Sequence, residues 1–102
     1  EFQGLTAYLE SDLKTFISES GAKSFDVKHK VGPFQGSPPQ AESTLDVQYI
    51  GSVGVGNDNW YWTEEQWMYE FAVAFSSASS KPDVVSMSYA WAETDQCQIN
   101  PS

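Results

Sequence analysis

The sequence predicts an α/β fold in which helices cover both faces of a parallel sheet. Segments with apolar residues at helical spacing (4–18, 41–50 and 63–80) alternate along the chain with short runs typical of strands (24–31, 60–62 and 81–91). Strands separated by helices pair in parallel, because each crossover returns the chain to the same edge of the sheet. No internal repeat or long linker divides the 102 residues, so we expect one small domain with a modest core.

The first half of the chain predicts a helix, a strand and a loop. Residues 4–18 place leucine and aromatic side chains three and four positions apart, and Gly21 supplies a helix stop. Residues 24–31 alternate apolar and polar side chains, which is the period of a half-buried strand. Residues 32–40 concentrate glycine and proline and are expected to form a loop.

The middle of the chain predicts a second helix and a short strand. Residues 41–50 read AESTLDVQYI and are expected to be helical, until the glycines of 51–56 break the pattern. These glycines have the wrong spacing for a dinucleotide-binding loop and predict a flexible turn. The aromatic run at 60–62 then predicts a strand.

The second half continues with a third helix and a last strand. Residues 63–80 open with Thr63 as the expected N-cap, and Trp67, Phe71 and Phe75 recur as a buried stripe. Residues 81–91 place a proline before a β-branched run and predict a buried strand followed by a loop.

The charge of the chain excludes some classes of binding partner. The sequence contains fourteen acidic residues and five lysines, and its net charge is −9, so the surface should repel nucleic acid and anionic membranes. No apolar run approaches the ~18 residues of a membrane span. The acid-rich composition suits an acidic compartment, where partial protonation relieves self-repulsion.

Several candidate sites are weak. Cys97 is the single cysteine, so an internal disulfide and a cysteine-based zinc cluster are excluded; the thiol is either idle or bridged to another chain. We also expect no metal or cofactor in this chain. His29 lies between two lysines on an expected strand and is interpreted as structural. The tryptophans at 60, 62 and 67 fit a sugar or peptide groove, but core and sheet-face packing is the preferred interpretation.

Glu42 and Asp46 are the candidate acid–base pair. Four residues apart on a helix, they project from one face, where like charges normally destabilise. One interpretation is a solvated helix start, with Glu42 complementing the helix dipole. The other is a functional unit: two carboxyl groups within hydrogen-bond reach hold one proton between them. Such a pair can activate a serine hydroxyl at acid pH, where a protonated histidine fails as a base.

ESTLDVQYI, residues 42–50, resembles the Glu-x-x-x-Asp helix motif of the sedolisins, the serine-carboxyl peptidases. That motif commonly reads E-A-S-L-D-V-Q-Y, and six of its eight residues stand here unchanged. PDVVSMSYAWAE (82–93) resembles the family strand that ends in Ser-Tyr-Gly or Ser-Trp-Gly, with Ala90 in place of glycine. GLTAYLESDLKTF (4–16) fits the helix that precedes the motif, and the three segments stand in family order.

The resemblance implies a subtilisin-like parallel sheet, incomplete in this chain, and hydrolysis of peptide bonds through an acyl-enzyme at acid pH. It makes Glu42 the general base and Asp46 its orienting partner. It also makes Ser88, Tyr89 and Ala90 the backbone edge that pairs with a bound peptide. Both endopeptidase and tripeptidyl-peptidase action fit this resemblance. The competing class is a non-catalytic acidic binding domain, in which the carboxylates are surface charge.

The family's nucleophile lies in a Gly-Thr-Ser motif, which this sequence does not contain. We therefore expect residues 1–102 to be a partial domain, inert alone, that is completed by a second chain from the same precursor. Family resemblance also places a calcium site in that missing part. The expected location is lysosomal or extracellular, where Cys97 would form an interchain disulfide beside a cleavage point just past Ser102.

Overall fold

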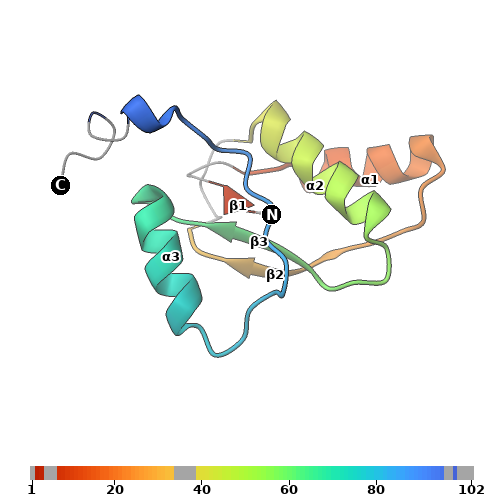
Figure 1. Cartoon of the computed structure of the whole chain (residues 1–102). Coiled ribbons are helices and arrows are strands. Elements are labelled where there is room, and N and C mark those ends of the chain that lie inside the picture. The colour runs from red at the N-terminus through yellow and green to blue at the C-terminus, as the bar shows by residue number, and fades with distance from the viewer. Residues whose placement is uncertain (1, 4–6, 34–38, 96–97, 99–102) are drawn as a thin grey trace.

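The computed structural model describes residues 2–3, 7–33, 39–95 and 98, and these form an α/β structure (Figure 1). The described strands are β1 (Phe2–Gln3), β2 (Val27–Val31) and β3 (Asn59–Thr63). The described helices are α1 (Glu10–Ser20), α2 (Ala41–Val53) and α3 (Trp67–Ser77), followed by a short 3-10 turn at Glu93–Asp95. Helices and strands alternate as the sequence predicts.

The sheet is parallel and its described strands have the order β1-β3-β2. Phe2 is aligned with Trp62 of β3 on one side and forms a parallel bridge with Met87 on the other. The Phe2 backbone N–H donates to the Ser86 carbonyl at 3.0 Å. The segment around Met87 therefore extends the sheet beyond β1, in a fourth position.

Tyr61 and Trp62 are adjacent in β3 and pack into two different core clusters on opposite faces of the sheet, because successive side chains of a strand point in opposite directions. Tyr61 is fully buried in a cluster that includes Leu13 of α1 and Val47 of α2. Trp62 packs in a second cluster with Phe2 and Phe71 of α3. Helices α1 and α2 thus cover one face and α3 covers the other, as Figure 1 shows. The prediction of helices on both faces is confirmed.

The crossover through α2 has the opposite hand to its neighbours. From β1 the chain crosses to β2 on the far side of β3, returns to β3, and then crosses beyond β1 to the position of Met87. The connections through α1 and α2 lie on the same face of the sheet but run in opposite directions across it. The connection through α3 runs in the same direction as that through α2, on the opposite face. Since about 98% of parallel crossovers are right-handed, we infer that the crossover through α2 is the left-handed exception.

Helix α1 begins later than predicted and ends where predicted. Ala7 forms a parallel bridge with Pro39, and Leu9 has extended backbone angles, so the helix starts only at Glu10. Pairing with a distant segment overrides the local helical pattern at these positions. The helix ends at Ser20, and Gly21 follows in the left-handed conformation (φ 72°) that favours glycine.

The predicted capping role of Thr63 is wrong. Thr63 is the last residue of β3, is fully buried, and donates its hydroxyl to the Val31 carbonyl at 3.4 Å. Helix α3 begins at Trp67 instead, where the backbone N–H of Gln66 donates to the Glu70 carboxylate at 3.0 Å. Phe71 is buried and Phe75 is half-buried against the same cluster, in agreement with the predicted stripe; the Trp67 side chain lies outside the described part.

The predicted strand at 81–91 is reduced to a single bridge at Met87. Val84 is 81% exposed, and Val85 is also exposed, in contrast to the buried run expected from their β-branched side chains.

Candidate active site

Helix α2 begins at a backbone anchor that fixes the position of Glu42. The N–H of Gln40 donates to the Ala7 carbonyl at 3.0 Å, which ties the helix start to the segment before α1. The backbone N–H and the hydroxyl of Thr44 both donate to the Gln40 carbonyl, at 3.0 and 2.9 Å, and close the first turn. Glu42 lies in this turn, where the helix dipole favours a negative charge.

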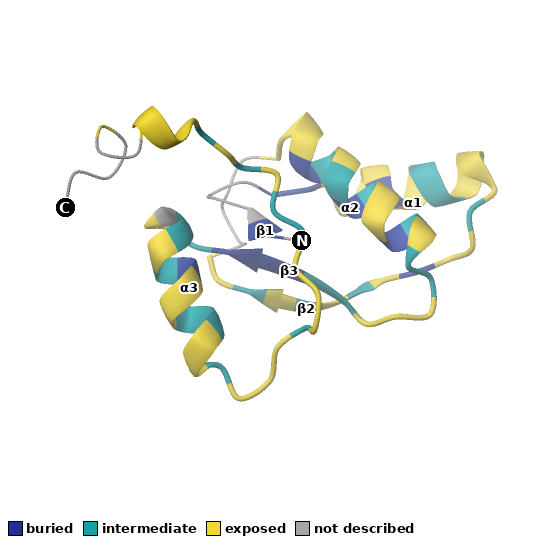
Figure 2. Cartoon of the chain, in the orientation of Figure 1, coloured by how far each residue is buried: buried dark blue, intermediate teal, exposed yellow. Residues whose placement is uncertain are grey.

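The two acids lie on the outward side of α2. Ser43, Val47 and Gly51 form the buried face of the helix (Figure 2). Glu42 is exposed and Asp46 is half-buried, on a side of the helix turned away from those residues. Residues four apart on a helix have Cβ atoms about 5–6 Å from each other. The fold therefore brings the two carboxylates together on an accessible surface, as their spacing predicts.

The acids and the 88–90 segment lie at the same edge of the sheet. Helix α2 follows β2 and so starts beside the carboxyl ends of the parallel strands. Ser88 comes directly after the bridge at Met87 and leaves the sheet at that edge too. Ligands of open α/β sheets bind outside the carboxyl ends of the strands. Glu42, Asp46 and the 88–90 segment therefore occupy the edge where such folds place their sites.

The 88–90 segment has the alternation of an extended chain at the border of the core. Tyr89 is half-buried, packs against the Phe2–Trp62–Phe71 cluster and meets the Phe2 ring edge-on at 6.0 Å. Ser88 and Ala90, on either side, are exposed. The Tyr89 ring thus anchors a stretch of backbone whose neighbouring side chains face outward.

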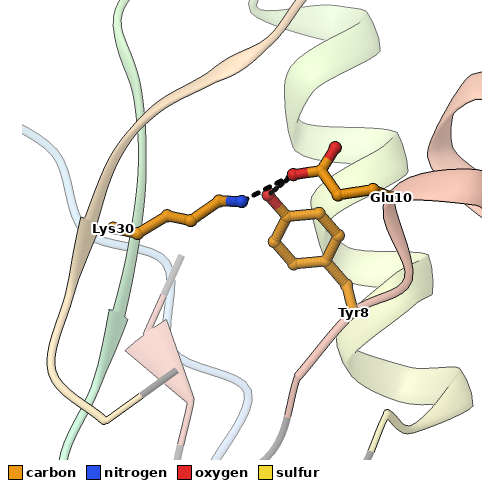
Figure 3. Close-up of polar contacts among 3 residues, drawn as sticks. All are labelled: Tyr8, Glu10 and Lys30. Carbon is orange, nitrogen blue, oxygen red and sulfur yellow. Dashed lines mark hydrogen bonds and ion pairs between the residues drawn. The ribbon is translucent and has the colours of Figure 1, made fainter. Parts of the chain in front are cut away.

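A polar cluster that no local sequence pattern predicted joins the start of α1 to β2 (Figure 3). One oxygen of Glu10, Oε1, accepts hydrogen bonds from the Tyr8 hydroxyl at 3.0 Å and from Lys30 Nζ at 2.6 Å. The hydrogen bond from Lys30, aided by the one from Tyr8, lowers the pKa of Glu10, and burial raises the pKa of Tyr8. The sequence gives little indication of this cluster, because Lys30 lies on a strand twenty residues from Glu10.

Replacing Lys30 by methionine should reduce stability more at neutral pH than at pH 3. A carboxyl group whose pKa is lowered by folding stabilises the folded state above its unfolded pKa, and this contribution disappears as the pH falls through the folded pKa. The Lys30 and Glu10 side chains are 34% and 51% exposed. Solvent screening therefore limits the loss to about 0.2–1 kcal/mol. Urea unfolding at both pH values measures the difference.

Lys28→Met is the matched control on the same strand. The hydrogen bond from Lys28 also lowers the pKa of its partner Asp58, but both side chains of that pair are 58% exposed, so the loss at neutral pH should be smaller than in Lys30→Met. An equal loss in the two variants, or a loss in Lys30→Met that is as large at pH 3 as at neutral pH, would contradict the role assigned to the cluster.

An open hollow of about 690 Å³ lies at the other edge of the sheet, beside the starts of β2 and β3. Its lining includes His29 and Trp60, whose rings stack with centroids 4.0 Å apart. Trp62 is buried in the core, so the preferred packing interpretation is confirmed for that residue. Trp60 both packs against the core and lines the hollow. Because α2 separates this hollow from Glu42 by the length of the helix, it is not the place for a substrate of the acid pair.

The described residues show neither a metal-binding cluster nor a membrane-spanning helix. Among them, no group of three or more His, Cys, Asp or Glu side chains could hold a metal ion. None of the described helices is long and apolar enough to cross a membrane. Cys97 lies outside the described residues, so its interchain disulfide stays a prediction.

Comparison with known proteins supports the relationship that the motifs indicate. Physarolisin from Physarum polycephalum is 46% identical to this chain over 99 residues, which are 97% of the chain. The match spans 17% of the length of Physarolisin. No family model and no solved structure matches the chain. The similarity to Physarolisin, a sedolisin-family peptidase, extends over nearly all of these residues and supports a sedolisin-like relationship.

Proposed function

We propose that this chain is the base-bearing part of an acid-acting serine-carboxyl peptidase. The observation that carries the proposal is the placement of Glu42 and Asp46 together on the accessible side of α2, at the sheet edge shared with residues 88–90. The similarity to Physarolisin supports the peptidase class. The nucleophilic serine would come from a second chain of the same precursor, because no Gly-Thr-Ser occurs in this sequence.

The proposed reaction is acyl transfer in two stages. The serine oxygen of the partner attacks the carbonyl carbon of the peptide bond, while Glu42 accepts the hydroxyl proton. As the C–N bond breaks, Glu42 returns that proton to the leaving amine, and an acyl-enzyme ester remains on the serine. Water then attacks the ester carbonyl while Glu42 accepts the water proton; as the bond from the acyl carbon to the serine oxygen breaks, Glu42 passes that proton to the serine oxygen, and the acid product leaves. Asp46, one turn along α2, holds Glu42 in the orientation that this transfer needs.

The proposed substrate is a peptide that lies extended along residues 88–90. A peptide can add as a strand to an exposed backbone edge, where main-chain hydrogen bonds fix its register. The exposed positions of Ser88 and Ala90 on either side of the anchored Tyr89 ring suit such pairing. Both endopeptidase and tripeptidyl-peptidase action fit this arrangement.

The proposed enzyme works in an acidic compartment and is held together by a disulfide between its two chains. An acid optimum fits a lysosomal or extracellular protein, and a net charge of −9 suits such a compartment. We place calcium outside residues 1–102, in the partner. An interchain disulfide through Cys97 would tether the two chains.

The experiment is isolation of the native protein, identification of its polypeptides by mass spectrometry, and assay of peptide hydrolysis from pH 3 to pH 7.5. We expect a tight complex of this chain with a polypeptide that contains Gly-Thr-Ser, and hydrolysis that is strong at acid pH and weak at neutral pH. A monomer that melts cooperatively and hydrolyses no peptide would favour a non-catalytic acidic binding domain instead.

A further inference from the structure

The segment that precedes α1 is joined to the start of α2. Ala7 forms a parallel bridge with Pro39, and its carbonyl accepts a hydrogen bond from the backbone N–H of Gln40 at 3.0 Å. Gln40 is the residue before α2, and Glu42 follows in the first turn of that helix. The position of Ala7 therefore influences the position of the helix start that carries the proposed base.

Tyr8, the residue after Ala7, is fixed to the sheet through both its ring and its hydroxyl. The residue is 3% exposed, and its ring meets the ring of Tyr61 in β3 edge-on, with the centroids 5.0 Å apart. Its hydroxyl shares Oε1 of Glu10 with Nζ of Lys30 in β2, and that Nζ lies 5.4 Å from the centre of the Tyr8 ring (Figure 3). We call Tyr8, Glu10 and Lys30 the Tyr8 cluster. It ties the segment before α1 to two strands of the sheet.

The charges of the Tyr8 cluster suit an acidic setting. The hydrogen bond from Lys30 lowers the pKa of Glu10; partial burial opposes this shift, and the hydrogen bond from Tyr8 and the charge of Lys14 add to it. A glutamate of ordinary pKa, about 4.3, loses its charge around that pH. Glu10 keeps its charge at lower pH, so the ion pair with Lys30 persists where an acid-acting peptidase would work.

We propose that the Tyr8 cluster positions Glu42 for proton transfer. This inference rests on the proposed function, because the position of Glu42 matters to the rate only if Glu42 is the base. The contacts run from β2 through the cluster to the segment before α1, and from there through Gln40 to the first turn of α2. Such support matters because a misplacement of about 1 Å can cost about 10²-fold in rate, even when its cause lies far from the reacting atoms.

The proposed peptide-binding segment is anchored on the other face of the sheet. Tyr89 packs against the core cluster under α3, whereas Tyr8 and Tyr61 belong to the cluster under α1 and α2. Loosening the Tyr8 cluster should therefore slow proton transfer and leave substrate binding intact. A lower kcat with an unchanged KM is the signature of such a loss.

The test measures kcat and KM for peptide hydrolysis by the complete protein, expressed as the full precursor. Tyr8→Phe removes the hydroxyl and keeps the ring, and Lys30→Met removes the cation. We expect kcat to fall roughly 10-fold in each variant, less than the loss from a full 1 Å displacement, with KM unchanged. Lys30→Arg keeps a charged donor for Glu10 and should retain most of the kcat. Lys28→Met, on the same strand, is the control and should have normal kcat and KM.

All kcat values are counted per acylated serine in the complete protein, since a loss of stability alone would lower the number of active copies but not the rate of each. A lower kcat with unchanged KM in Tyr8→Phe and Lys30→Met, recovered in Lys30→Arg, supports the positioning role. Normal kcat in both variants, or an equal loss in Lys28→Met, overturns it. Glu42→Gln reports on the proposed function separately. If Glu42→Gln abolishes hydrolysis while the Tyr8 cluster variants are normal, only the positioning role fails; if Glu42→Gln is fully active, both fail.

Discussion

Glu42→Gln should lower kcat for peptide hydrolysis by the complete two-chain protein about 10²- to 10⁴-fold, the usual effect of losing a general base. The amide keeps the shape of the side chain but cannot accept the serine proton. Glu42 lies exposed in the first turn of α2, so the substitution leaves the buried face of that helix untouched. The loss should therefore appear in kcat at every pH between about 3 and 6, with folding and chain association unchanged.

Two companion variants sharpen this result. Glu19→Gln removes another exposed carboxylate, from α1, and should retain full activity. Asp46→Asn keeps the base but removes the group that is proposed to orient it, one turn along α2, so activity should fall. If the acids were only surface charge, both α2 substitutions would relieve repulsion and leave activity intact. Full activity in Glu42→Gln would remove the catalytic assignment.

Gly51→Ala should destabilise the protein by about 1–3 kcal/mol, the usual cost of overpacking a core. In an isolated helix the same change would stabilise by roughly 1 kcal/mol. Here a Cβ atom on Gly51 would lie 2.0 Å from Cε2 of Phe25 and 2.4 Å from its Cζ, and Phe25 is a buried core residue. Either the ring or α2 must move, and movement of α2 would also displace Glu42. Urea unfolding measures the loss of stability.

The Phe25 ring supplies the control for this prediction. Phe25→Leu removes Cε2 and Cζ, the two ring atoms nearest to the new methyl group, so Gly51→Ala should cost less in that background. Coupling between residues in contact is commonly about 0.5–3 kcal/mol. The same loss in both backgrounds would show that contact with Phe25 is not the reason for glycine at this position.

The sequence predicted what depends on local periodicity and on turn residues. Strand β3 occurs where its pattern places it, and Gly21 follows α1 with φ 72°. Helix α2 begins at the predicted residue but continues to Val53, so the expected break at the glycines of 51–56 is wrong for Gly51, which is buried in the helix. The division of the core also follows from the pattern, since Tyr61 and Trp62 alternate along one strand. For the site, a spacing of four residues was sufficient to place Glu42 and Asp46 on one side of a helix.

The errors arose where distant segments decide local structure. The bridge between Ala7 and Pro39 delays the start of α1, and no local signal reports it. Thr63 has the chemistry of an N-cap, but β3 extends through it and its hydroxyl bonds to Val31 across the sheet. The contact of Lys30 with Glu10 joins residues twenty positions apart. The hand of the α2 crossover likewise depends on strand order, which single-sequence patterns do not contain.

The most direct test of the central claim is to trap the acyl group during turnover. The complete protein is mixed with a chromogenic peptide ester at about pH 4, near the ordinary range of carboxyl groups, quenched in acid within milliseconds, and digested for mass spectrometry. We expect a burst of about one product per copy of this chain, and the acyl group on a serine outside residues 1–102. The burst should be absent in Glu42→Gln. An acyl group on a residue within 1–102, or an undiminished burst in Glu42→Gln, would contradict a chain that supplies the base and a partner that supplies the nucleophile.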